Sequence, residues 1–524
     1  SIVDRNGDEL AISVPVETVW ADPKIIMDNN ALSMTEHWQA LADVLGKDVN
    51  KLTTRVVRSP TKRFVYLERK ISPAMAKYIR ELKIPGIHLR KESKRFYPTG
   101  EISAHIVGFT NVDDKGIEGV ENVYDKFLTG KGGNKRFRKD AKGRKVEILS
   151  VQKAQAAQDV TLTIDQRIQA IAYKELKGAV QAFKATSGSV IVADIHTGEI
   201  LALTNSPSYN PNNRRNTAIH RFRNRAITDT YEPGSTMKPL AALTSLEFGS
   251  AQANTIIDTS PGWMRLGGRR VNDPRNRGKL SIEDILVTSS NMGTAKLALS
   301  VPKNFLLDKF FDAGFAEATG TDLVGESSGM MHDRQRWSKF ELATLSFGYG
   351  LAITPLQLTR FYAALANGGI KHELSIVKNE QSETQPEGVR IFSKENAQTI
   401  TAMLETVVDE HVEKAKVDGY RVGGKTGTTL KAVAGGYGND YVALFAGVAP
   451  ISNPQVVVVV VINDPDGDLY HGGEVAAPVF SRVMKGALQV LNIAPDAREE
   501  LALSNALIEA EVDIIASNEE ANDA

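Results

Sequence analysis

The chain has 524 residues with 63 basic and 63 acidic side chains, so its formal net charge is zero. This length exceeds that of one compact core, and two or three domains are expected. The balanced charge gives no electrostatic footprint for nucleic-acid binding, and the absence of cysteine excludes disulfides, zinc–thiolate sites and cysteine nucleophiles.

The first 155 residues or so are rich in Lys and Arg and in short segments broken by turns. They carry no catalytic string in a fitting context, so residues 1–157 are predicted to form a pedestal or partner-binding module. Their glycine-rich, basic stretch 129–145 is interpreted as a solvated loop, with contact to an anionic glycan as the alternative.

A second domain is predicted over residues 158–495. Its expected elements, in chain order, are a strand at 160–163, a helix at 166–183 capped by Asp165, a hairpin of 189–193 with 199–204, a mostly helical block at 281–365, strands at 441–448 and 456–462, and a helix at about 475–491. The run 456–462 is strongly apolar but has seven residues where a membrane-spanning helix needs about twenty, so it predicts a buried strand. The expected fold is α+β, with helices covering an antiparallel sheet and the site between a helix and an edge strand.

Ser235-Thr236-Met237-Lys238 is the first of three strings that together indicate acyl transfer by serine and lysine. It follows the turn signal Glu232-Pro233-Gly234 and precedes an apolar run that predicts a buried helix ending near Gly249. Ser235 is therefore expected at a helix N-terminus, where free N–H groups and the helix dipole favour the charge that develops during attack on a carbonyl. Pro239 falls in the first turn, where its missing N–H costs little.

Lys238 lies three residues after Ser235, so it is expected on the same side of this helix, within reach of the serine hydroxyl. A role as base requires the neutral amine at working pH. Burial beside a second cation would lower the pKa of Lys238 in that direction, and we expect Lys425 to be that cation.

The second string is Ser289-Ser290-Asn291, and the third is Lys425-Thr426-Gly427-Thr428. Ser289 is the candidate proton shuttle between Lys238 and a leaving amine, and Asn291 can hydrogen-bond a substrate amide with both donor and acceptor.

The glycine-rich stretch 420–429 predicts an edge strand against which a peptide backbone can lie. Lys425, Thr426 and Thr428 are expected to hold a substrate carboxylate, and the N–H groups of Ser235 and Thr428 form the predicted oxyanion hole. Ser290 and Gly427 complete the predicted substrate-binding residues. The glycine-rich segment 429–440 is predicted to be a mobile loop on the acceptor side of the site.

Each string alone has an ordinary explanation: a capped helix start, a polar turn and the rim of a hairpin. A serine three residues before a lysine recurs in the chain, and Ser208-Tyr209-Asn210 imitates the middle string. The second and third strings begin 54 and 190 residues after Ser235, and their joint order favours the catalytic interpretation.

Two further patterns suggest other functions. The string at 325–329, Gly-Glu-Ser-Ser-Gly, fits the nucleophile elbow of an esterase with His372, His411 or His471 as base, but the residues after it do not predict a buried helix. The acidic string at 464–468 hints at calcium, but the glycine and glutamate of an EF-hand loop are missing at positions 469 and 475. A surface turn is the preferred interpretation there.

With its three strings the chain resembles the class B penicillin-binding proteins. Residues 223–234 and 346–350 around the site are similar to that family, and so are the N-terminal boxes Asp4-Arg5-Asn6-Gly7, Arg95-Phe96-Tyr97-Pro98 and Gly116-Ile117-Glu118-Gly119-Val120-Glu121, which separate class B from small β-lactamases. The family's first box begins with an Arg-Gly pair, preceded by a short cytoplasmic tail and one membrane-spanning helix. The chain starts at Ser1, so we expect this anchor to lie outside the sequence.

The resemblance implies a serine-lysine, penicillin-recognising transpeptidase domain on an N-terminal pedestal. It implies peptidoglycan D,D-transpeptidation at the division septum: Ser235 attacks the penultimate D-Ala of a stem peptide, the terminal D-Ala leaves, and the amine of a second stem peptide attacks the acyl-enzyme. It also implies no cofactor or metal, β-lactams as covalent inhibitors, and division proteins, including a septal glycosyltransferase, as partners at the periplasmic face of the inner membrane.

Three alternatives differ in what happens to the acyl-enzyme. The sequence has no Glu-x-x-Leu-Asn string, with which class A β-lactamases position a hydrolytic water, so a transpeptidase is favoured over a β-lactamase. A D,D-carboxypeptidase stays open, because only the attacking group differs. A division scaffold, or a sensor that is acylated once, is the non-enzymatic alternative.

The chain ends in an acidic stretch. Residues 496–524 carry nine acidic side chains and one basic side chain, and they are predicted to form a frayed helix followed by disorder.

Overall fold

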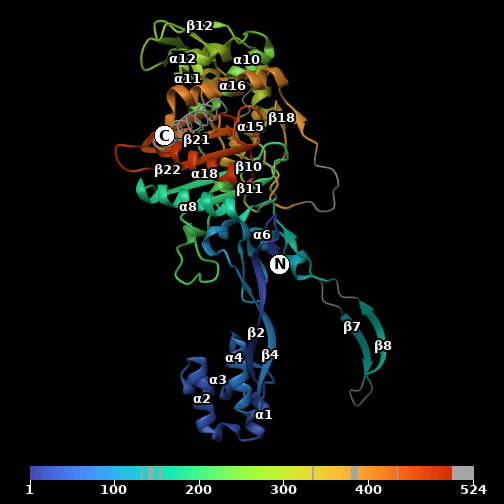
Figure 1. Cartoon of the computed structure of the whole chain (residues 1–524). Helices are drawn as coiled ribbons and strands as arrows, with labels where there is room; N and C mark the ends of the chain where they lie inside the picture. Colours follow the sequence, from blue (N-terminus) through green and yellow to red (C-terminus); the bar gives the residue numbers. More distant parts are fainter. Residues whose placement is uncertain are drawn as a thin grey trace, which may run out of the picture.

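The computed structural model describes residues 1–130, 134–139, 145–152, 156–332, 336–378, 387–433 and 435–497, with the backbone alone for 134–139 and 145–152. Figure 1 shows a broad body, in which helices surround a sheet, and a narrow stem that leads from the body to a small helical head. The N-terminus lies where stem and body meet.

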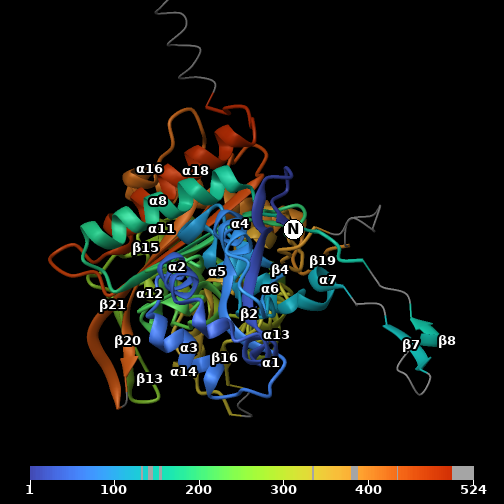
Figure 2. The same cartoon turned by 90° about the horizontal axis from the view of Figure 1, so that it is seen from below.

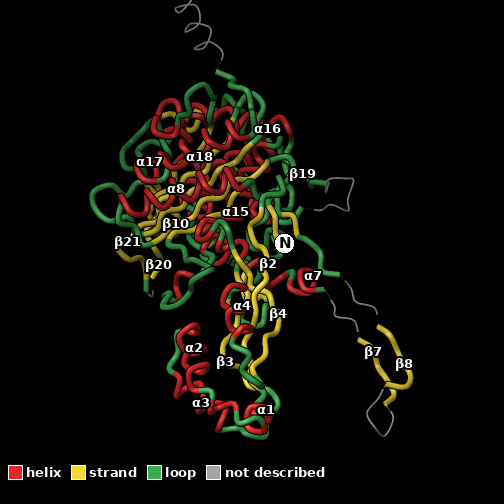
Figure 3. The backbone as a smooth tube through the Cα atoms, turned by 60° about the horizontal axis from the view of Figure 1, so that its bottom comes forward, coloured by secondary structure: helices red, strands yellow, loops and turns green. Residues whose placement is uncertain are grey.

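Long antiparallel strands form the stem, as the strand colouring of Figure 3 shows. β2 (Glu9–Ala21) pairs along most of its length with β4 (Ile87–Phe96) and, toward the head, with β3 (Val65–Ile71). The 13 residues of β2 span about 40 Å at roughly 3.3 Å per residue, which separates the head from the body. The head consists of α1 (Pro23–Asp28), η1 (Ala31–Ser33), α2 (Thr35–Leu45), α3 (Val49–Val57) and α4 (Pro73–Glu81).

The head has a hydrophobic core of its own. Trp38 on α2 is 1% exposed, and its indole N–H donates to the carbonyl of Ala31 at 2.9 Å. Leu41, Leu52 and Ile79 belong to the same buried cluster, which is separate from the clusters of the body. The head can therefore lose its packing without loss of the body core.

Residues 4–6 bind the stem to the body at the start of α8 (Gln166–Ala182). The Asp4 carboxylate accepts the N–H of Gln166 at 3.0 Å, and the Asn6 amide donates to Asp165 at 3.2 Å. Asp165 caps α8 by accepting the N–H of Arg167, which confirms the predicted cap and helix. Beside these contacts, β1 (Ile2–Val3) pairs with both β2 and β9 (Val160–Thr161).

A buried ion pair supports the junction from the other strand of the stem. The Arg95 Nε donates to the Glu121 carboxylate at 2.7 Å, and the two side chains are 9% and 3% exposed. The other elements of this region are short: η2 (Gly100–Ile102), α5 (Ala104–Val107), β5 (Phe109–Thr110), β6 (Gly116–Glu118), α6 (Gly119–Val123), α7 (Asp125–Thr129), β7 (Asn134–Lys139) and β8 (Lys145–Gln152).

Five antiparallel strands form the sheet of the body, in the order β11 (Ile200–Ser206), β10 (Ser187–Asp194), β22 (Val456–Asn463), β21 (Gly436–Ala449) and β20 (Gly423–Val433). The central strand β22 is apolar on both faces, and the helices α18 (Ala477–Val490) and α15 (Pro355–Ala366) pack against it. α8 lies beside α18 and covers β10 and β11, and Figure 2 shows the two helices next to each other. This confirms the predicted α+β fold, the hairpin of 189–193 with 199–204, the buried strand and the edge position of β20.

Helices and short strands complete the body around this sheet. The helices are η3 (Ile219–Phe222), α9 (Arg225–Thr228), η4 (Gly234–Met237), α10 (Lys238–Phe248), α11 (Ile282–Val287), α12 (Asn291–Leu299), α13 (Lys303–Asp312), α14 (Lys339–Ser346), α16 (Lys394–His411), η5 (Glu413–Ala415) and α17 (Gly472–Val475). The strands are β12 (Ile256–Asp258), β13 (Trp263–Leu266), β14 (Arg269–Asn272), β15 (Lys279–Ser281), β16 (Met330–Met331), β17 (Leu351–Ala352), β18 (Ile370–Lys371) and β19 (Val389–Arg390).

Two segments that were predicted as loops contain strands. The predicted loop 429–440 is largely a continuation of β20 and β21, in which Leu430 pairs with Tyr441 and Ala432 with Tyr437. Residues 134–139 of the predicted loop 129–145 form a strand, while 131–133 and 140–144 lie outside the described residues. Glycine and charge indicated loops, but ladder pairing overrode these local preferences.

The acidic C-terminal stretch is described only at its start. The Asp496 carboxylate accepts the N–H groups of Arg421 at 2.7 Å and Ser452 at 3.1 Å, so this residue is part of the body rather than of a frayed tail. The rest of the prediction, residues 498–524, lies outside the described residues.

Within the described ranges, none of the helices combines the length and the apolar character that are needed to cross a membrane.

Trp38→Ala is expected to destabilise the head by about 3–5 kcal/mol, because it leaves a cavity in a small core. A separate low-temperature transition should appear in calorimetry. The rate at which a β-lactam such as benzylpenicillin acylates Ser235 should stay at the wild-type value. Tyr78→Ala, at an aromatic residue of the head that is 45% exposed, is the matched control and should leave the transition in place. One joint transition, shifted in Trp38→Ala, would contradict the independence of the two cores.

Candidate active site

Ser235 lies on the tight turn η4, which runs directly into the buried helix α10. Gly234 has φ +55°, a conformation that favours glycine, and it turns the chain into η4. Pro239 stands in the first turn of α10, and Gly249 ends the helix in the left-handed conformation. The predicted position of Ser235 at a helix start is thus confirmed.

Neighbouring elements hold this turn from three sides. The N–H of Gly234 donates to the carbonyl of Gly348, and the hydroxyl of Tyr362 on α15 donates to the carbonyl of Thr236 at 2.8 Å. On the edge strand β20, the hydroxyl of Thr429 donates to the carbonyl of Glu232 at 3.1 Å. The backbone around Ser235 is therefore fixed before any substrate arrives.

The hydroxyl of Ser289 is the centre of the site. Its Oγ lies 3.0 Å from Ser235 Oγ, and it accepts from Lys238 Nζ at 2.9 Å and from Lys425 Nζ at 3.2 Å. Lys238 Nζ also donates to the carbonyl of Ser289 at 2.5 Å. Four predicted residues thus meet, although the contacts of Lys238 run to Ser289 and not, as expected, directly to Ser235.

Both lysines are buried, each 1% exposed. Burial is the main cause that lowers the pKa of Lys238 well below its usual value, and the nearby charge of Lys425 lowers it further. Burial lowers the pKa of Lys425 to about 8. A neutral Lys238 beside a protonated Lys425 is therefore accessible near neutral pH.

Asp273, which the sequence did not single out, fixes the second string. Its carboxylate accepts the Ser290 hydroxyl at 2.5 Å and the N–H of Met292 at 3.0 Å, and it raises the pKa of Lys238 against the effect of burial. Ser290 is 0% exposed, and it also caps α12 by accepting the N–H of Gly293. Its hydroxyl is used inside the protein, and its predicted place among substrate-binding residues stays a prediction. The sequence offered only an Asn-Asp-Pro turn as a signal for Asp273.

Gly427 lets the edge strand approach the nucleophile turn. A Cβ at this position would lie 2.9 Å from the carbonyl oxygen of Pro233 and 3.0 Å from the Thr236 side chain. Lys425, Gly427 and Thr429 occupy every second position of β20. Because side chains in a strand alternate between its two faces, all three lie on the face toward the nucleophile turn.

The other predicted substrate residues surround this centre. Thr426 lies near Gly473, and the hydroxyl of Thr428 accepts the N–H of Gly472, which attaches α17 to the edge strand. Asn291, half-buried at the start of α12, donates to the carbonyl of Asn272 at 3.4 Å. Carboxylate binding by Thr426 and Thr428 and the oxyanion hole of Ser235 and Thr428 stay predictions.

The two competing strings have ordinary structural roles. The segment 325–329 is irregular and leads into the short strand β16, whereas a nucleophile elbow joins a strand to a helix. Asp464 accepts from Lys431 Nζ at 2.8 Å and from the Thr186 hydroxyl at 2.7 Å, and the residues after it form the predicted exposed turn between β22 and α17.

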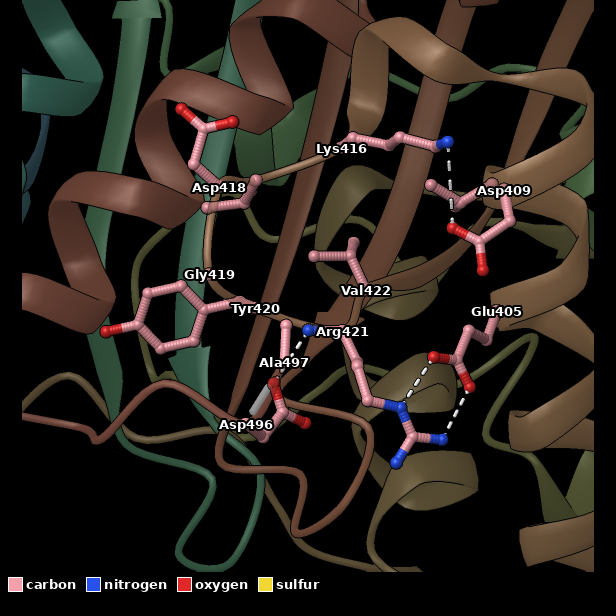
Figure 4. Close-up of a pocket in the computed structure, with 12 residues that line it drawn as sticks. Glu405, Asp409, Lys416, Asp418, Gly419, Tyr420, Arg421, Val422, Asp496 and Ala497 are labelled. Atoms are coloured by element: carbon pink, nitrogen blue, oxygen red, sulfur yellow. Dashed lines mark hydrogen bonds and ion pairs between the residues drawn. The ribbon is translucent and has the colours of Figure 1, made fainter. Parts of the chain in front are cut away.

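A pocket of about 710 Å³ opens where β20 begins, and Figure 4 shows its side chains. Arg421 donates to both carboxylate oxygens of Glu405, at 2.7 and 2.8 Å, and Lys416 pairs with Asp409. None of its twelve lining residues belongs to the three strings, and its main charged groups satisfy one another. The paired residues that line this pocket hold the segment that leads into β20 in place.

Gly348→Ala is expected to destabilise the chain by about 1–3 kcal/mol and to slow labelling of Ser235 tenfold or more, because the added Cβ would lie 2.1 Å from the Gly234 oxygen. Gly350→Ala is the matched control: both glycines have positive φ, +86° and +80°, but a Cβ on Gly350 meets nothing within 4 Å. Labelling rates and melting temperatures of both variants test this contact. Equal loss in the two variants would mean that backbone strain alone, and not the contact with the turn, is responsible.

Both parts of the chain match known protein domains. Residues 188–485 match the model of the penicillin binding protein transpeptidase domain, and residues 1–162 match that of the penicillin-binding protein dimerisation domain. The peptidoglycan D,D-transpeptidase FtsI of Escherichia coli K12 is 47% identical over 499 residues, which are 95% of this chain and 84% of that protein.

Solved structures resemble the chain over the same extent. A peptidoglycan synthetase from Bifidobacterium adolescentis has a TM-score of 0.76 at 27% identity, and penicillin-binding protein 3 of Mycobacterium tuberculosis in complex with aztreonam has 0.74 at 26%. Each alignment covers 95% of this chain and 96% of the other. Since these likenesses include stem, head and body alike, the chain belongs to the penicillin-binding proteins, with their transpeptidase domain carried on an N-terminal pedestal.

Proposed function

We propose that the chain is a peptidoglycan D,D-transpeptidase that cross-links stem peptides at the division septum through an acyl-serine intermediate on Ser235. The observation that carries the proposal is the hydroxyl of Ser289, which lies within hydrogen-bond distance of Ser235, Lys238 and Lys425 at once. The 47% identical relative in Escherichia coli bears the name of this activity.

The first half-reaction forms the acyl-enzyme. Ser235 Oγ attacks the carbonyl of the penultimate D-Ala, and its proton passes through the Ser289 hydroxyl to the neutral amine of Lys238. When the tetrahedral intermediate collapses, the C–N bond breaks, and the proton returns from Lys238 through Ser289 to the leaving nitrogen of D-Ala. The N–H groups of Ser235 and Thr428 stabilise the oxyanion.

The second half-reaction reverses these proton movements. An amine of the acceptor stem peptide attacks the acyl carbon and loses its proton to Lys238 through Ser289, and Ser235 regains a proton as the ester bond breaks. During the first half-reaction, before D-Ala leaves, Asn291 binds an amide of the donor, while Lys425, Thr426 and Thr428 hold its terminal carboxylate beside Gly427.

A D,D-carboxypeptidase is the second candidate, because water in place of the amine would complete the same cycle. The two activities share every step up to the acyl-enzyme. The relative in Escherichia coli is named for transpeptidation, and this similarity is what favours the cross-linking reaction.

The domain limits and partners extend this proposal. We divide the chain into a pedestal at 1–157, a transpeptidase domain at 158–495 and an acidic tail at 496–524. Stem peptides are the substrates and β-lactams the covalent inhibitors, and division proteins, including a septal glycosyltransferase, are the partners. Because peptidoglycan is assembled outside the inner membrane, the periplasmic face of that membrane is the proposed location, with a single helix as anchor.

Incubation with benzylpenicillin is expected to add one covalent adduct, detected by intact-protein mass spectrometry and stable for hours. Ser235→Ala should abolish this adduct, because it removes the hydroxyl at the start of α10 whose proton passes through Ser289 to Lys238. Ser327→Ala, at the centre of the competing string 325–329, is the control and should be labelled like the wild type. Rapid loss of the adduct would indicate a hydrolase, and no adduct in the wild type would overturn the proposal.

The acylation rate should depend on pH with two limbs. It rises as Lys238 loses its proton, at a pH well below the usual lysine value, and it falls near pH 8 as Lys425 loses the charge that the site requires. Stopped-flow rates with benzylpenicillin between about pH 5 and 9.5 would show both limbs. Lys425→Arg should remove the falling limb, since a guanidinium keeps its proton in this range. A wild-type rate that still increases above about pH 9 would contradict these roles.

A further inference from the structure

The loop 272–278 lies against the second catalytic string. Its residue Asn272 accepts the side-chain amide of Asn291, and Asp273 accepts both the Ser290 hydroxyl and the N–H of Met292. At its other end, the Gly278 carbonyl accepts the N–H and the hydroxyl of Thr259 at 2.7 Å each. The loop is therefore fixed at both ends beside Ser289, and Arg277 stands on it.

Arg277 is half-buried and has no counter-ion within the part of the chain that the structure describes. Its Nε is enclosed by protein atoms, yet it has no hydrogen-bond partner among the described residues. Its guanidinium forms no ion pair with any described carboxylate, and the nearby carboxylate of Asp273 is occupied by Ser290 and Met292. A buried donor without a partner costs free energy. The Nη groups of Arg277 also have no hydrogen bond to a described residue, and they are the part of the guanidinium that an arriving anion can reach.

The charge of Arg277 acts on the catalytic centre. With burial and the charge of Lys425, it is among the causes that lower the pKa of both Lys238 and His411. Arg277 and Lys425 are therefore both close to Lys238 and His411, and this region also adjoins Thr426, since Thr426 and Val412 both lie near Gly473. An anion bound in this region would be attracted by each positive charge around it.

Lys425 alone is a weak anchor for an anion. It is buried with a pKa lowered to about 8, and its Nζ already donates to Ser289. A guanidinium, by contrast, stays charged in this pH range and presents a planar fork that matches a carboxylate.

We propose that Arg277 binds the terminal carboxylate of the donor peptide and thereby selects acyl donors that carry this charge. The proposal rests on the transpeptidase function proposed above, and it names a ligand contact outside the three strings. The carboxylate of a β-lactam would occupy the same place.

The test compares benzylpenicillin with its methyl ester, which keeps the reactive ring but lacks the negative charge. Second-order acylation rates are measured by intact mass at timed intervals for the wild type and Arg277→Gln. The variant should react about tenfold or more slowly with the acid and within about twofold of the wild type with the ester, because only the acid can use a charge-assisted hydrogen bond. Arg277→Lys should recover part of the rate with the acid.

Arg275→Gln is the matched control, since Arg275 is an exposed arginine two residues away on the same loop. Its rates with both reagents should equal those of the wild type. An equal loss of Arg277→Gln with acid and ester would show that Arg277 acts through Lys238 instead, and unchanged rates with both would exclude any role; either result overturns the proposal. A wild type that neither reagent acylates would mean that the proposed transpeptidase function itself has failed.

Discussion

Burial of two lysine side chains around one serine hydroxyl is the constraint on which the rest of the structure depends. Removing two ammonium groups from water is costly, and their mutual repulsion adds to the cost. The site offsets part of it with the carbonyl and hydroxyl of Ser289 and with the nearby charge of Asp273. The part of the burial cost that is not offset lowers the pKa of Lys238. This lowered pKa is what allows Lys238 to act as a base.

Such a site works only if the surrounding backbone keeps these side chains in fixed positions. Gly234 and Gly348 are in backbone contact, Gly427 brings the edge strand against Pro233, and Tyr362 binds the turn from the covering helix α15. Each contact comes from a different part of the chain, so the sheet and its helices together set the distance between Ser235 and Ser289. Preorganisation of this kind moves the cost of orienting the groups from the reaction to folding.

The sequence predicted the elements that have a strong local pattern and the residues that form short strings. The capped helix α8, the buried strand β22 and the meeting of Ser235, Lys238, Ser289 and Lys425 follow from periodicity, capping and chain order. Asp273 and Arg277 were missed, because their roles arise from a loop whose sequence shows only turn residues. The burial of the Ser290 hydroxyl was missed for a related reason: a string indicates which residues are close to the site, but only the fold decides which side chains point inward. The segment 429–440 was predicted as a loop because glycine is ambiguous between a loop and an extended hairpin.

Anion binding and contact with the proton relay Ser289 make different demands on the ammonium group of Lys425. Lys425 contacts Ser289 at 3.2 Å, and with a pKa of about 8 it holds its proton only weakly. Whenever it gave up that proton, its attraction for a carboxylate would vanish, so a site that relied on Lys425 alone would release its substrate as the protonation state changed. A permanently charged guanidinium on the adjoining loop separates the two demands. The same loop carries Asp273, which opposes the charge of the lysines and fixes Ser290. Loop 272–278 therefore contributes both a negative charge, on Asp273, and a positive charge, on Arg277, to the site. No spacing in the sequence marks this loop as part of the site.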